Sequence, residues 1–339
     1  MALELQVDRE PPPGWDDAIR AAGGNVFATE AWAEFQCHGR RGDALYCRWT
    51  GAEGGVARAL GIRRPGRASR AGRVAGRVIF DTPPVGGPAG QDHVAPLRRW
   101  ARRRPALLDV ELRSADARGA WCGGMPPEPV HRLELVRTIS TDGEALVAGI
   151  HAKHRRSLKK AADLGVAVRE VAAGETTALR RFAELGEESG RQLERRKGVV
   201  AAKADLDAFA GSLAVLMERR AGRLWLAEHD GAAEAGAFFG VFGDSAYYLY
   251  SGASEAARDL VAVPLALGAA LRAFGAAGVT HVNLGGVGAD AADPASQDHG
   301  LLRFKARWGA EPVPRLGGVI ALRPRRAAAV ARLRRLTGR

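Results

Sequence analysis

The stretch RLWLAEHDGAAEAGAFFGVFGDSAYYLYSG (Arg223–Gly252) contains three apolar runs separated by two short polar turns. Asp230-Gly231 separates the first two runs, and Gly243-Asp244 separates the second from the third. Asp-Gly between apolar runs favours a tight hairpin, because both central residues of such a turn adopt positive φ. We therefore predict three consecutive antiparallel strands over about 223–229, 234–242 and 245–252.

Further helices and strands are predicted on both sides of this meander. VAVREV (Val166–Val171) alternates like a strand, and THVNL (Thr280–Leu284) gives another. The remaining expected elements are helices over about 176–191, 205–220, 261–277 and 300–308, and a strand near 317–322. From Val166 onward the order is therefore β-α-α-β-β-β-α-β-α-β, which is typical of the GNAT (acyl-CoA N-acyltransferase-like) fold.

The first half of the chain gives a similar order of elements. Helices are expected over about 15–22, 28–37 and 92–103, and strands over about 43–50, 55–63, 73–80 and 107–113. Both halves thus run α-α-β-β-β-α-β, which predicts an α+β protein of two tandem GNAT-like domains. The boundary is expected near 125–140, around GGMPPEPV (Gly123–Val130), which gives domains over 1–130 and 131–322, followed by a basic C-terminal tail over 323–339.

The charge balance favours a polyanionic partner. The 339-residue chain has a formal net charge of +12. Such a charge suits nucleic acid, an anionic membrane surface or a phosphorylated substrate. An Arg- and Ala-rich composition also raises the charge without any function, so both interpretations stay open.

Cysteine usage and hydropathy predict a cytoplasmic protein. The three cysteines form no Cys-x-x-Cys pair, which favours a reducing compartment. The N-terminus has no basic segment followed by an apolar core, as a signal peptide would. The longest apolar run, Leu260–Leu271, is too short to span a bilayer.

A basic helix is predicted over HAKHRRSLKKAADLG (His151–Gly165). At about 100° per residue, Lys153, Arg156 and Lys160 fall on one stripe. This stripe is either a phosphate-contacting surface or an ordinary solvated face. His151 and His154 have no evident third ligand, so no metal is expected.

Two segments bear on whether the chain binds a dinucleotide or an acyl-CoA. NLGGVGADA (Asn283–Ala291) loosely matches a dinucleotide fingerprint, but a loop follows instead of a helix. Gly285 and Gly286 are better explained as letting the backbone pass close to a ligand or a packed strand. GNAT enzymes that use acetyl-CoA usually carry R/Q-x-x-G-x-G/A after the third meander strand, whereas Arg258 here is followed by Asp-Leu-Val. The usual CoA cradle is therefore missing.

Polar residues at two further places are candidates for chemistry. Asp109 and Glu111 lie two apart on a predicted strand and share one face, as a general acid–base pair or as carboxylates on an exposed sheet edge. In GLLRFKARWG (Gly300–Gly309) the apolar residues have helical spacing, and Lys305 stands beside Phe304 at the edge of the face expected to be buried.

Six segments in this order resemble the Fem-type (FemABX) aminoacyltransferases, which have tandem GNAT-like domains. They are VFATEAWAEF (Val26–Phe35), VGGP (Val85–Pro88), the basic segment His151–Val168, YYLYSGAS (Tyr247–Ser254), VNLGGV (Val282–Val287) and GLLRFKARWG. The long coiled-coil arm of some family members is absent from the sequence.

The resemblance implies transfer of an amino acid from aminoacyl-tRNA to an amine, usually on a peptidoglycan precursor. It implies neither a cofactor nor a metal, since the ester is already activated and catalysis rests on positioning and charge stabilisation. Phe304 would anchor its helix, and Lys305 would offset negative charge on the tetrahedral oxyanion or the tRNA end. A lysine that only snorkels to solvent is the alternative.

The resemblance also implies roles for residues outside this helix. Tyr248 and Tyr250, expected on one strand face, would line the same cleft, while Glu111 and Arg196 would contact the acceptor. Some members have an acceptor-binding lysine where Gln36 stands here, which leaves the acceptor open and includes small natural-product amines. An acyl-CoA-dependent N-acyltransferase and a non-catalytic RNA-binding module are the alternative functions.

Overall fold

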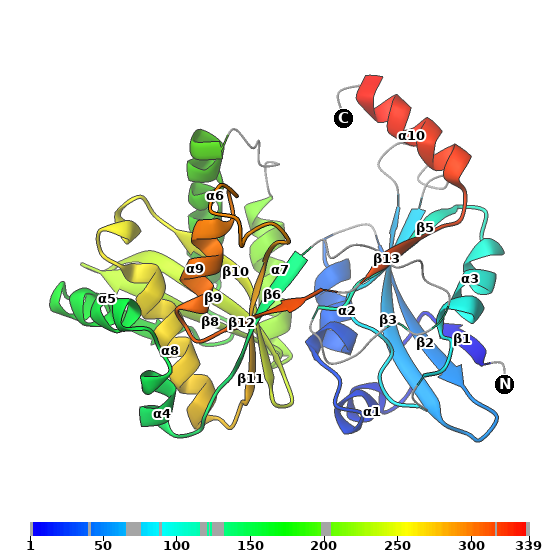
Figure 1. The fold of residues 1–339 in the computed structure, drawn as a ribbon, viewed down its shortest axis with the longest axis horizontal. Coiled ribbons are helices and arrows are strands. Elements are labelled where there is room, and N and C mark those ends of the chain that lie inside the picture. The colour runs from blue at the N-terminus through cyan, green and yellow to red at the C-terminus, as the bar shows by residue number, and fades with distance from the viewer. Residues whose placement is uncertain are drawn as a thin grey trace. The chain divides into compact units, whose positions relative to one another are not determined.

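The chain folds into two units, each built around one β-sheet (Figure 1). The computed structural model describes residues 3–39, 42–65, 76–87, 90–115, 121, 123, 132–197, 205–315 and 317–336. The first unit comprises residues 1–131 and 314–339, and the second comprises residues 132–313. Most of the expected boundary segment GGMPPEPV lies outside the described residues.

The first unit contains a six-stranded sheet in the order β1-β2-β3-β4-β5-β13. Its strands are β1 (Glu4–Asp8), β2 (Asp43–Thr50), β3 (Val56–Pro65), β4 (Gly76–Phe80), β5 (Leu107–Leu112) and β13 (Gly318–Ala321). Its helices are α1 (Trp15–Ala21), the 3-10 turn η1 (Val26–Ala28), α2 (Glu30–Cys37), α3 (Val94–Arg102) and α10 (Pro324–Leu336). Only β4 and β5 pair in parallel among neighbours in this sheet, and α3 provides the crossover between them.

The prediction that residues 314–322 belong to the second domain is wrong. β13 pairs antiparallel with β5, from Gly318 opposite Leu112 to Ala321 opposite Asp109. Arg323 then donates to the carbonyl oxygen of Leu107 at 2.7 Å, which ties the start of α10 to the same strand. Without β13 the backbone groups along the outer side of β5 would form an open sheet edge. The expected basic tail therefore begins as part of the first unit.

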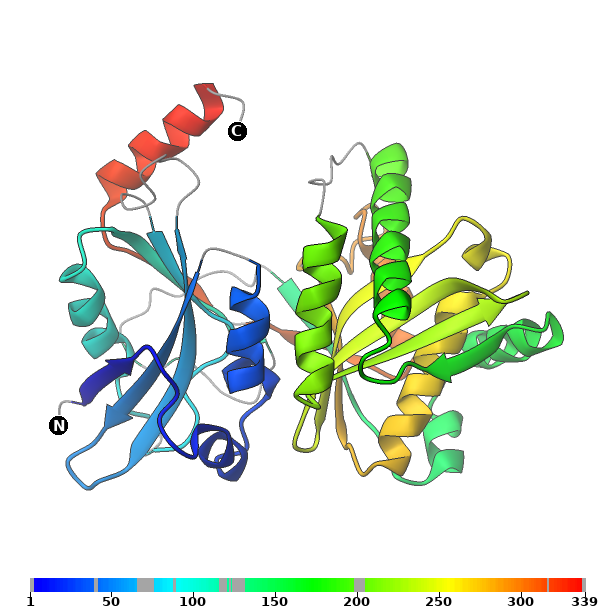
Figure 2. The same ribbon diagram turned by 180° about the vertical axis from the view of Figure 1, so that it is seen from behind.

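The second unit contains a seven-stranded sheet in the order β12-β6-β11-β10-β9-β8-β7 (Figure 2). Its strands are β6 (Arg132–Thr138), β7 (Ala167–Glu170), β8 (Gly222–His229), β9 (Ala232–Phe242), β10 (Ser245–Ala253), β11 (His281–Gly288) and β12 (Glu311–Pro314). Its helices are α4 (Gly143–Ala148), α5 (Ala152–Asp163), α6 (Thr176–Lys197), α7 (Leu206–Glu218), the 3-10 turn η2 (Ala256–Arg258), α8 (Ala262–Ala276) and α9 (His299–Ala306).

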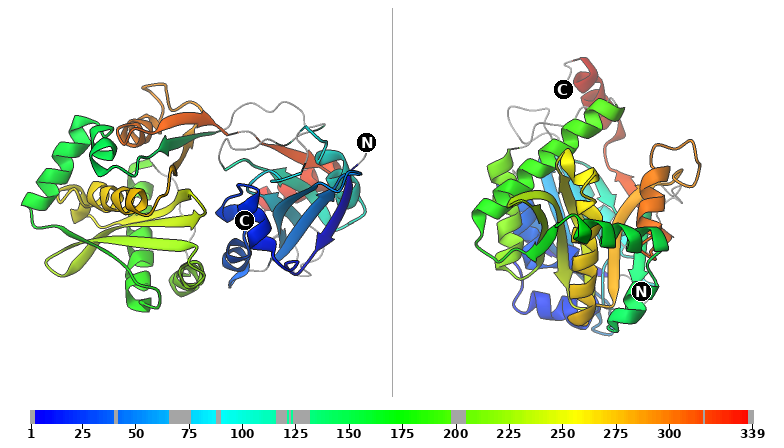
Figure 3. Two further views of the ribbon diagram at one scale, coloured as in Figure 1. Left: turned by 90° about the horizontal axis from the view of Figure 1, so that it is seen from below. Right: turned by 90° about the vertical axis from the view of Figure 1, so that its left-hand side faces the viewer.

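Helices cover both faces of the second sheet (Figure 3). Phe238 and Phe239 are neighbours on β9 and therefore point to opposite faces. Phe239 packs edge-on against Phe274 of α8, while Phe238 stacks with Phe182 of α6. α8 is apolar nearly all round, as expected of a helix buried between the sheet and other helices.

The prediction of an α+β chain with two tandem units is confirmed, because the two sheets repeat one strand pattern. In each unit four strands pair antiparallel in succession, and the last of them pairs in parallel with a fifth strand. The predicted meander is the β8-β9-β10 part of the second unit. The strands β1, β6 and β12 were not predicted.

Candidate active site

Two parallel strands of the second unit separate after a short paired region. β10 and β11 pair only at Ser245–His281, Ala246–Val282 and Tyr247–Asn283, although β10 continues to Ala253 and β11 to Gly288. In the first unit, the corresponding strands β4 and β5 stay paired to their ends, at Phe80 and Leu112. Beyond this point the ends of β10 and β11 in the second unit are no longer paired with each other. We call the space between them the strand opening.

A glycine pair and a buried asparagine turn β11 away from β10. The side-chain oxygen of Asn283 accepts a hydrogen bond from the Gly285 N–H at 2.7 Å, and Gly285 has φ +77°. The pairing of β11 with β6 shifts register between Asn283 and Gly286. A Cβ at Gly286 would lie 1.9 Å from Nε of Arg132 and 2.8 Å from Oε1 of Glu134. Both glycines therefore serve a backbone path that a side chain would block.

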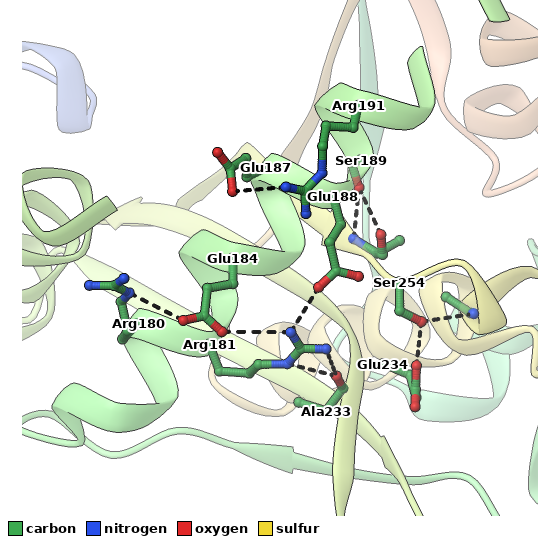
Figure 4. Close-up of polar contacts among 12 residues, drawn as sticks. Arg180, Arg181, Glu184, Glu187, Glu188, Ser189, Arg191, Ala233, Glu234 and Ser254 are labelled. Carbon is green, nitrogen blue, oxygen red and sulfur yellow. Dashed lines mark hydrogen bonds and ion pairs between the residues drawn. The ribbon is translucent and has the colours of Figure 1, made fainter. Parts of the chain in front are cut away.

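β10 is held on the other side of the strand opening by α6. A Cβ at Gly252 would lie 2.7 Å from the backbone nitrogen of Gly186 and 2.7 Å from Cβ of Leu185. The Ser189 hydroxyl accepts from the N–H of Ala253 at 2.8 Å and donates to its carbonyl oxygen at 3.2 Å (Figure 4). Backbone contact and hydrogen bonds thus fix the end of β10 to the helix.

Ion pairs along α6 continue this attachment to β9 (Figure 4). Arg181 bonds Glu188 at 2.9 Å and also donates to the carbonyl oxygen of Ala233 at 3.0 Å. Glu234 accepts from the hydroxyl of Ser254, directly after β10. The ends of both strands are therefore tied together and to one helix face.

The prediction that Tyr248 and Tyr250 share one strand face is wrong. The β9–β10 register shifts between them, because a β-bulge places Tyr248 opposite Phe239 and Tyr250 opposite Phe238. Tyr248 stacks on Phe239 at 5.0 Å on the α8 side, and burial raises its pKa to about 12. Tyr250 packs edge-on against Phe209 of α7 at 5.0 Å, on the opposite face. The two hydroxyls therefore do not line one cleft wall.

Lys305 projects from α9 to the strand opening. Its side chain is only 7% exposed, and its Nζ donates to the carbonyl oxygen of Gly286 at 3.0 Å. The same Nζ lies 3.3 Å from the place where Gly285 would carry a Cβ, and that place is 3.3 Å from the carbonyl oxygen of Tyr248. A snorkelling lysine keeps its ammonium in water, so that alternative does not fit.

The surroundings of Lys305 lower its proton affinity. Burial lowers the pKa of Lys305 to about 8, while the charges of Glu134 and Asp298 oppose this and Arg132 adds to it. Glu134 is 5% exposed and accepts from Nε of Arg132 at 3.2 Å, and the carboxylate of Asp298 accepts from the Gly288 N–H at 2.9 Å. With this pKa, Lys305 is mostly charged at pH 7 and loses its charge at a lower pH than an ordinary lysine.

Sequence reasoning missed Glu134 because the β6 segment was assigned to the expected domain boundary. The available signal was HRLELVRT (His131–Thr138), in which Leu133 and Leu135 alternate with Arg132 and Glu134. Lysine is also rare in this chain, with six in 339 residues against forty-four arginines. A buried lysine therefore stands out against the composition.

α9 is anchored through its backbone by a histidine of α5. Nε2 of His154 bonds the carbonyl oxygen of Phe304 at 2.9 Å, and the imidazole packs on the rings of Phe304 and Trp308 at 5.0 and 4.6 Å. Burial lowers the pKa of His154, so the neutral Nε2–H tautomer donates this bond. His151 accepts from the Lys153 N–H and caps α5. Both histidines therefore have structural partners.

The predicted basic stripe is exposed on this same α5. Lys153, Arg156 and Lys160 are all exposed, while His154 and Ala161 face the interior. Arg155 instead donates to backbone carbonyl oxygens near the end of α4. The exposed face of α5 thus carries three cations, and its buried face contacts α9, the helix of Lys305.

Of the two residues expected at the acceptor, Glu111 belongs to the first unit and Arg196 to the second. Glu111, on β5 of the first unit, binds Arg77 at 2.8 Å and Arg113 at 2.7 Å, and these partners lower its pKa despite burial. Asp109 also binds Arg77, at 2.6 Å, and β13 covers this strand, so these carboxylates are not on a sheet edge. Arg196 belongs to α6, and its side chain lies outside the described residues.

Comparisons with known proteins agree with this architecture. Residues 149–305 match the model of an acetyltransferase (GNAT) domain. The crystal structure of FemX superposes with a TM-score of 0.70 at 14% identity, covering 93% of this chain and 98% of FemX. The chain has a FemX-like fold. The resemblance seen in the sequence is thereby confirmed at the level of the fold, and the GNAT assignment of the second unit is confirmed.

Two further solved structures share this FemX-like fold. L-PGS from Bacillus licheniformis has a TM-score of 0.55 at 14% identity, covering 98% of this chain and 99% of that one. The C-terminal domain of a putative lysylphosphatidylglycerol synthetase from Agrobacterium fabrum has a TM-score of 0.53 at 17% identity, covering 85% and 87%. No curated protein sequence matches the chain. Among the described helices, none combines the length and apolar character needed to cross a bilayer.

Proposed function

We propose that the chain is an acyltransferase that moves an amino acid from aminoacyl-tRNA to an amine. The observation that carries this proposal is the buried ammonium of Lys305 beside the strand opening of the GNAT domain. In the reaction the amine nitrogen bonds the ester carbonyl carbon, and the carbon–oxygen ester bond breaks. The proton released by the amine passes, directly or through water, to the ribose oxygen that leaves. Lys305 offsets the charge on the carbonyl oxygen while the tetrahedral intermediate exists.

The acyl-CoA alternative is less well supported by the segment that would hold the pyrophosphate. No glycine occurs between Gly252 and Gly268, the segment that joins β10 to α8. Pro264 lies in the first turn of α8 and removes one of the amides that would bind a phosphate. The donor we propose brings its own polyanion, and the exposed stripe of α5 suits phosphates of the tRNA acceptor stem.

The resemblance and the solved structures favour two chemical classes of acceptor. The resemblance to the Fem-type family implies the amine of a peptidoglycan precursor peptide, and FemX has the highest TM-score given above. The lysylphosphatidylglycerol synthetase likenesses favour phosphatidylglycerol, whose hydroxyl would replace the amine and form an ester. We place the peptidoglycan precursor first because its amine is the better nucleophile toward an ester.

A donor assay tests this function. The purified chain is offered radiolabelled aminoacyl-tRNAs or labelled acetyl-CoA, each with peptidoglycan precursors or with phosphatidylglycerol vesicles. We expect label to move from tRNA into an RNase-resistant product, and the vesicle arm to identify a lipid acceptor. Transfer from acetyl-CoA alone would reject the proposal.

The pH dependence of transfer follows from the ammonium of Lys305. Only the protonated form stabilises an oxyanion, so activity should fall as pH rises through about 8, the folded-state pKa. Single-turnover rates from pH 6 to 10, corrected for uncatalysed ester hydrolysis, measure this. A rate that keeps rising to pH 10 would indicate that amine deprotonation alone controls transfer.

Neutralising the α5 stripe should weaken tRNA binding. With Lys153, Arg156 and Lys160 all changed to Gln, we expect weaker affinity and a salt slope smaller by about 2–3, because each cation releases roughly one counterion. Filter binding from 50 to 300 mM salt measures both quantities. Arg272→Gln, at an exposed position on α8, is the control. An unchanged salt slope in the triple variant would mean that the stripe is an ordinary solvated face and does not contact tRNA.

A further inference from the structure

A buried carboxylate on β6 lies against the backbone segment that holds Lys305. Glu134 pairs with Gly286 across the β6–β11 ladder, and the carbonyl oxygen of Gly286 accepts from Lys305. A Cβ at Gly286 would lie 1.9 Å from Nε of Arg132 and 2.8 Å from Oε1 of Glu134, so this ion pair occupies the space that the glycine leaves. Glu134 and Lys305 thus approach one glycine from two different elements.

Three charged groups surround the ammonium besides the glycine carbonyl. Glu134 and Arg132 belong to β6, and Asp298 is the residue that immediately precedes α9. Asp298 accepts from the Gly288 N–H, whereas the side chain of Arg132 is half exposed and its Nε donates to Glu134. Glu134 is the most buried of the three, and a buried carboxylate is costly unless opposite charge compensates it.

We propose that Glu134 is a positioning residue that keeps Lys305 charged at the strand opening, and that Arg132 moderates this effect by sharing the carboxylate. The catalytic consequence rests on the proposed function, but the coupling of the three charges does not. Because the side chain of Arg132 is far more exposed than that of Glu134, an approaching polyanion that draws it away would leave the full carboxylate charge facing Lys305. Binding of a polyanion at Arg132 would thereby favour the charged form of Lys305.

The test is direct titration of Lys305 by NMR in the full chain labelled with ε-¹³C-lysine. The chain has six lysines, so six signals are expected, and the signal lost in Lys305→Arg is that of Lys305. In Glu134→Gln we expect the pKa of Lys305 to fall below its wild-type value of about 8, by about one pH unit or more. In Arg132→Gln we expect it to rise.

Because the pKa of Lys305 should shift in opposite directions in the two variants, the pair of measurements separates electrostatic coupling from structural damage. A loosened fold would expose Lys305 and move its pKa toward about 10.4, the ordinary lysine value, in both variants. That result, or an unchanged pKa in both, overturns the proposal. If Glu134→Gln does not fold, Arg132→Gln decides together with its thermal midpoint: a raised pKa of Lys305 with an unchanged midpoint supports the coupling, and an unchanged pKa or a raised pKa with a lowered midpoint overturns it. The control is Glu311→Gln, an exposed carboxylate on β12 of the same sheet, which should leave the titration unchanged.

The transfer assay then separates this proposal from the proposed function. In Glu134→Gln the alkaline decline of the transfer rate should begin at a lower pH than in the wild type. Shifted titrations without any tRNA-dependent transfer would reject the function and keep the coupling. Normal transfer with unshifted titrations would keep the function and reject the coupling.

Discussion

Lys305→Met is expected to lower the rate of aminoacyl transfer at least tenfold, equivalent to about 1.4 kcal/mol of barrier or more. Methionine has a similar length but no N–H to place beside the oxyanion, and loss of one such donor typically costs about 10²–10³ in rate. Single-turnover transfer at pH 7 measures the effect. Arg303→Met, at an exposed position of the same helix, is the matched control and should transfer near normally.

The same variant should keep its stability, which sets Lys305 apart from core residues. The folded-state pKa of Lys305 is depressed, so its ammonium destabilises the fold below about pH 8, and this penalty fades as pH rises toward 10.5. Methionine removes the penalty but leaves the Gly286 carbonyl without its donor, a cost of about 1–3 kcal/mol. We therefore expect a thermal midpoint at pH 7 within a few degrees of the wild type, or above it. A large loss of stability would mean that Lys305 is held for packing.

Gly252→Ala is expected to destabilise the second unit by about 3 kcal/mol. The added methyl would meet the backbone of Gly186 and the Cβ of Leu185 at 2.7 Å, and neither can rotate away. For a unit of this size the thermal midpoint should fall by roughly 6–12 °C. Because β10 would have to leave α6, transfer should weaken as well. Circular dichroism melts and the donor assay measure the two effects.

Gly186→Ala, on the helix side of the same crossing, is the matched comparison. No atom lies within 4 Å of its added methyl, and alanine in a helix interior is better than glycine by about 1 kcal/mol. This variant should therefore be slightly more stable than the wild type. Equal losses of thermal stability in Gly252→Ala and Gly186→Ala would contradict the close approach of α6 to β10.

Local patterns predicted much of the fold because they report on one element at a time. Asp230 and Gly231 have φ of +50° and +77°, as the hairpin signal requires. β13 was recognised as a strand, but its partner β5 lies about 200 residues earlier, and alternation does not encode which sheet edge a strand joins. The bulge that separates Tyr248 from Tyr250 depends on pairing with β9, so it was equally invisible.

The candidate site was predictable only where neighbours in sequence define it. The Phe-Lys pair stands in one helix and was found. Glu134 precedes Lys305 by more than 160 residues, and only the β6–β11 ladder and the close approach at Gly286 bring it near. Its burial beside an ammonium therefore required the folded structure.

Photocrosslinking of the aminoacyl end tests the central claim most directly. An RNA hairpin that mimics a tRNA acceptor stem, with a diazirine-bearing aminoacyl group joined to its 3′ end by a stable amide, is irradiated with the full chain. Mass spectrometry then locates the modified peptides. We predict crosslinks in Tyr248–Gly252, Gly285–Gly288 or α9, and their loss on competition with unmodified hairpin. Crosslinks confined to the first unit would contradict the assignment of the strand opening and Lys305 as the acyl-transfer site.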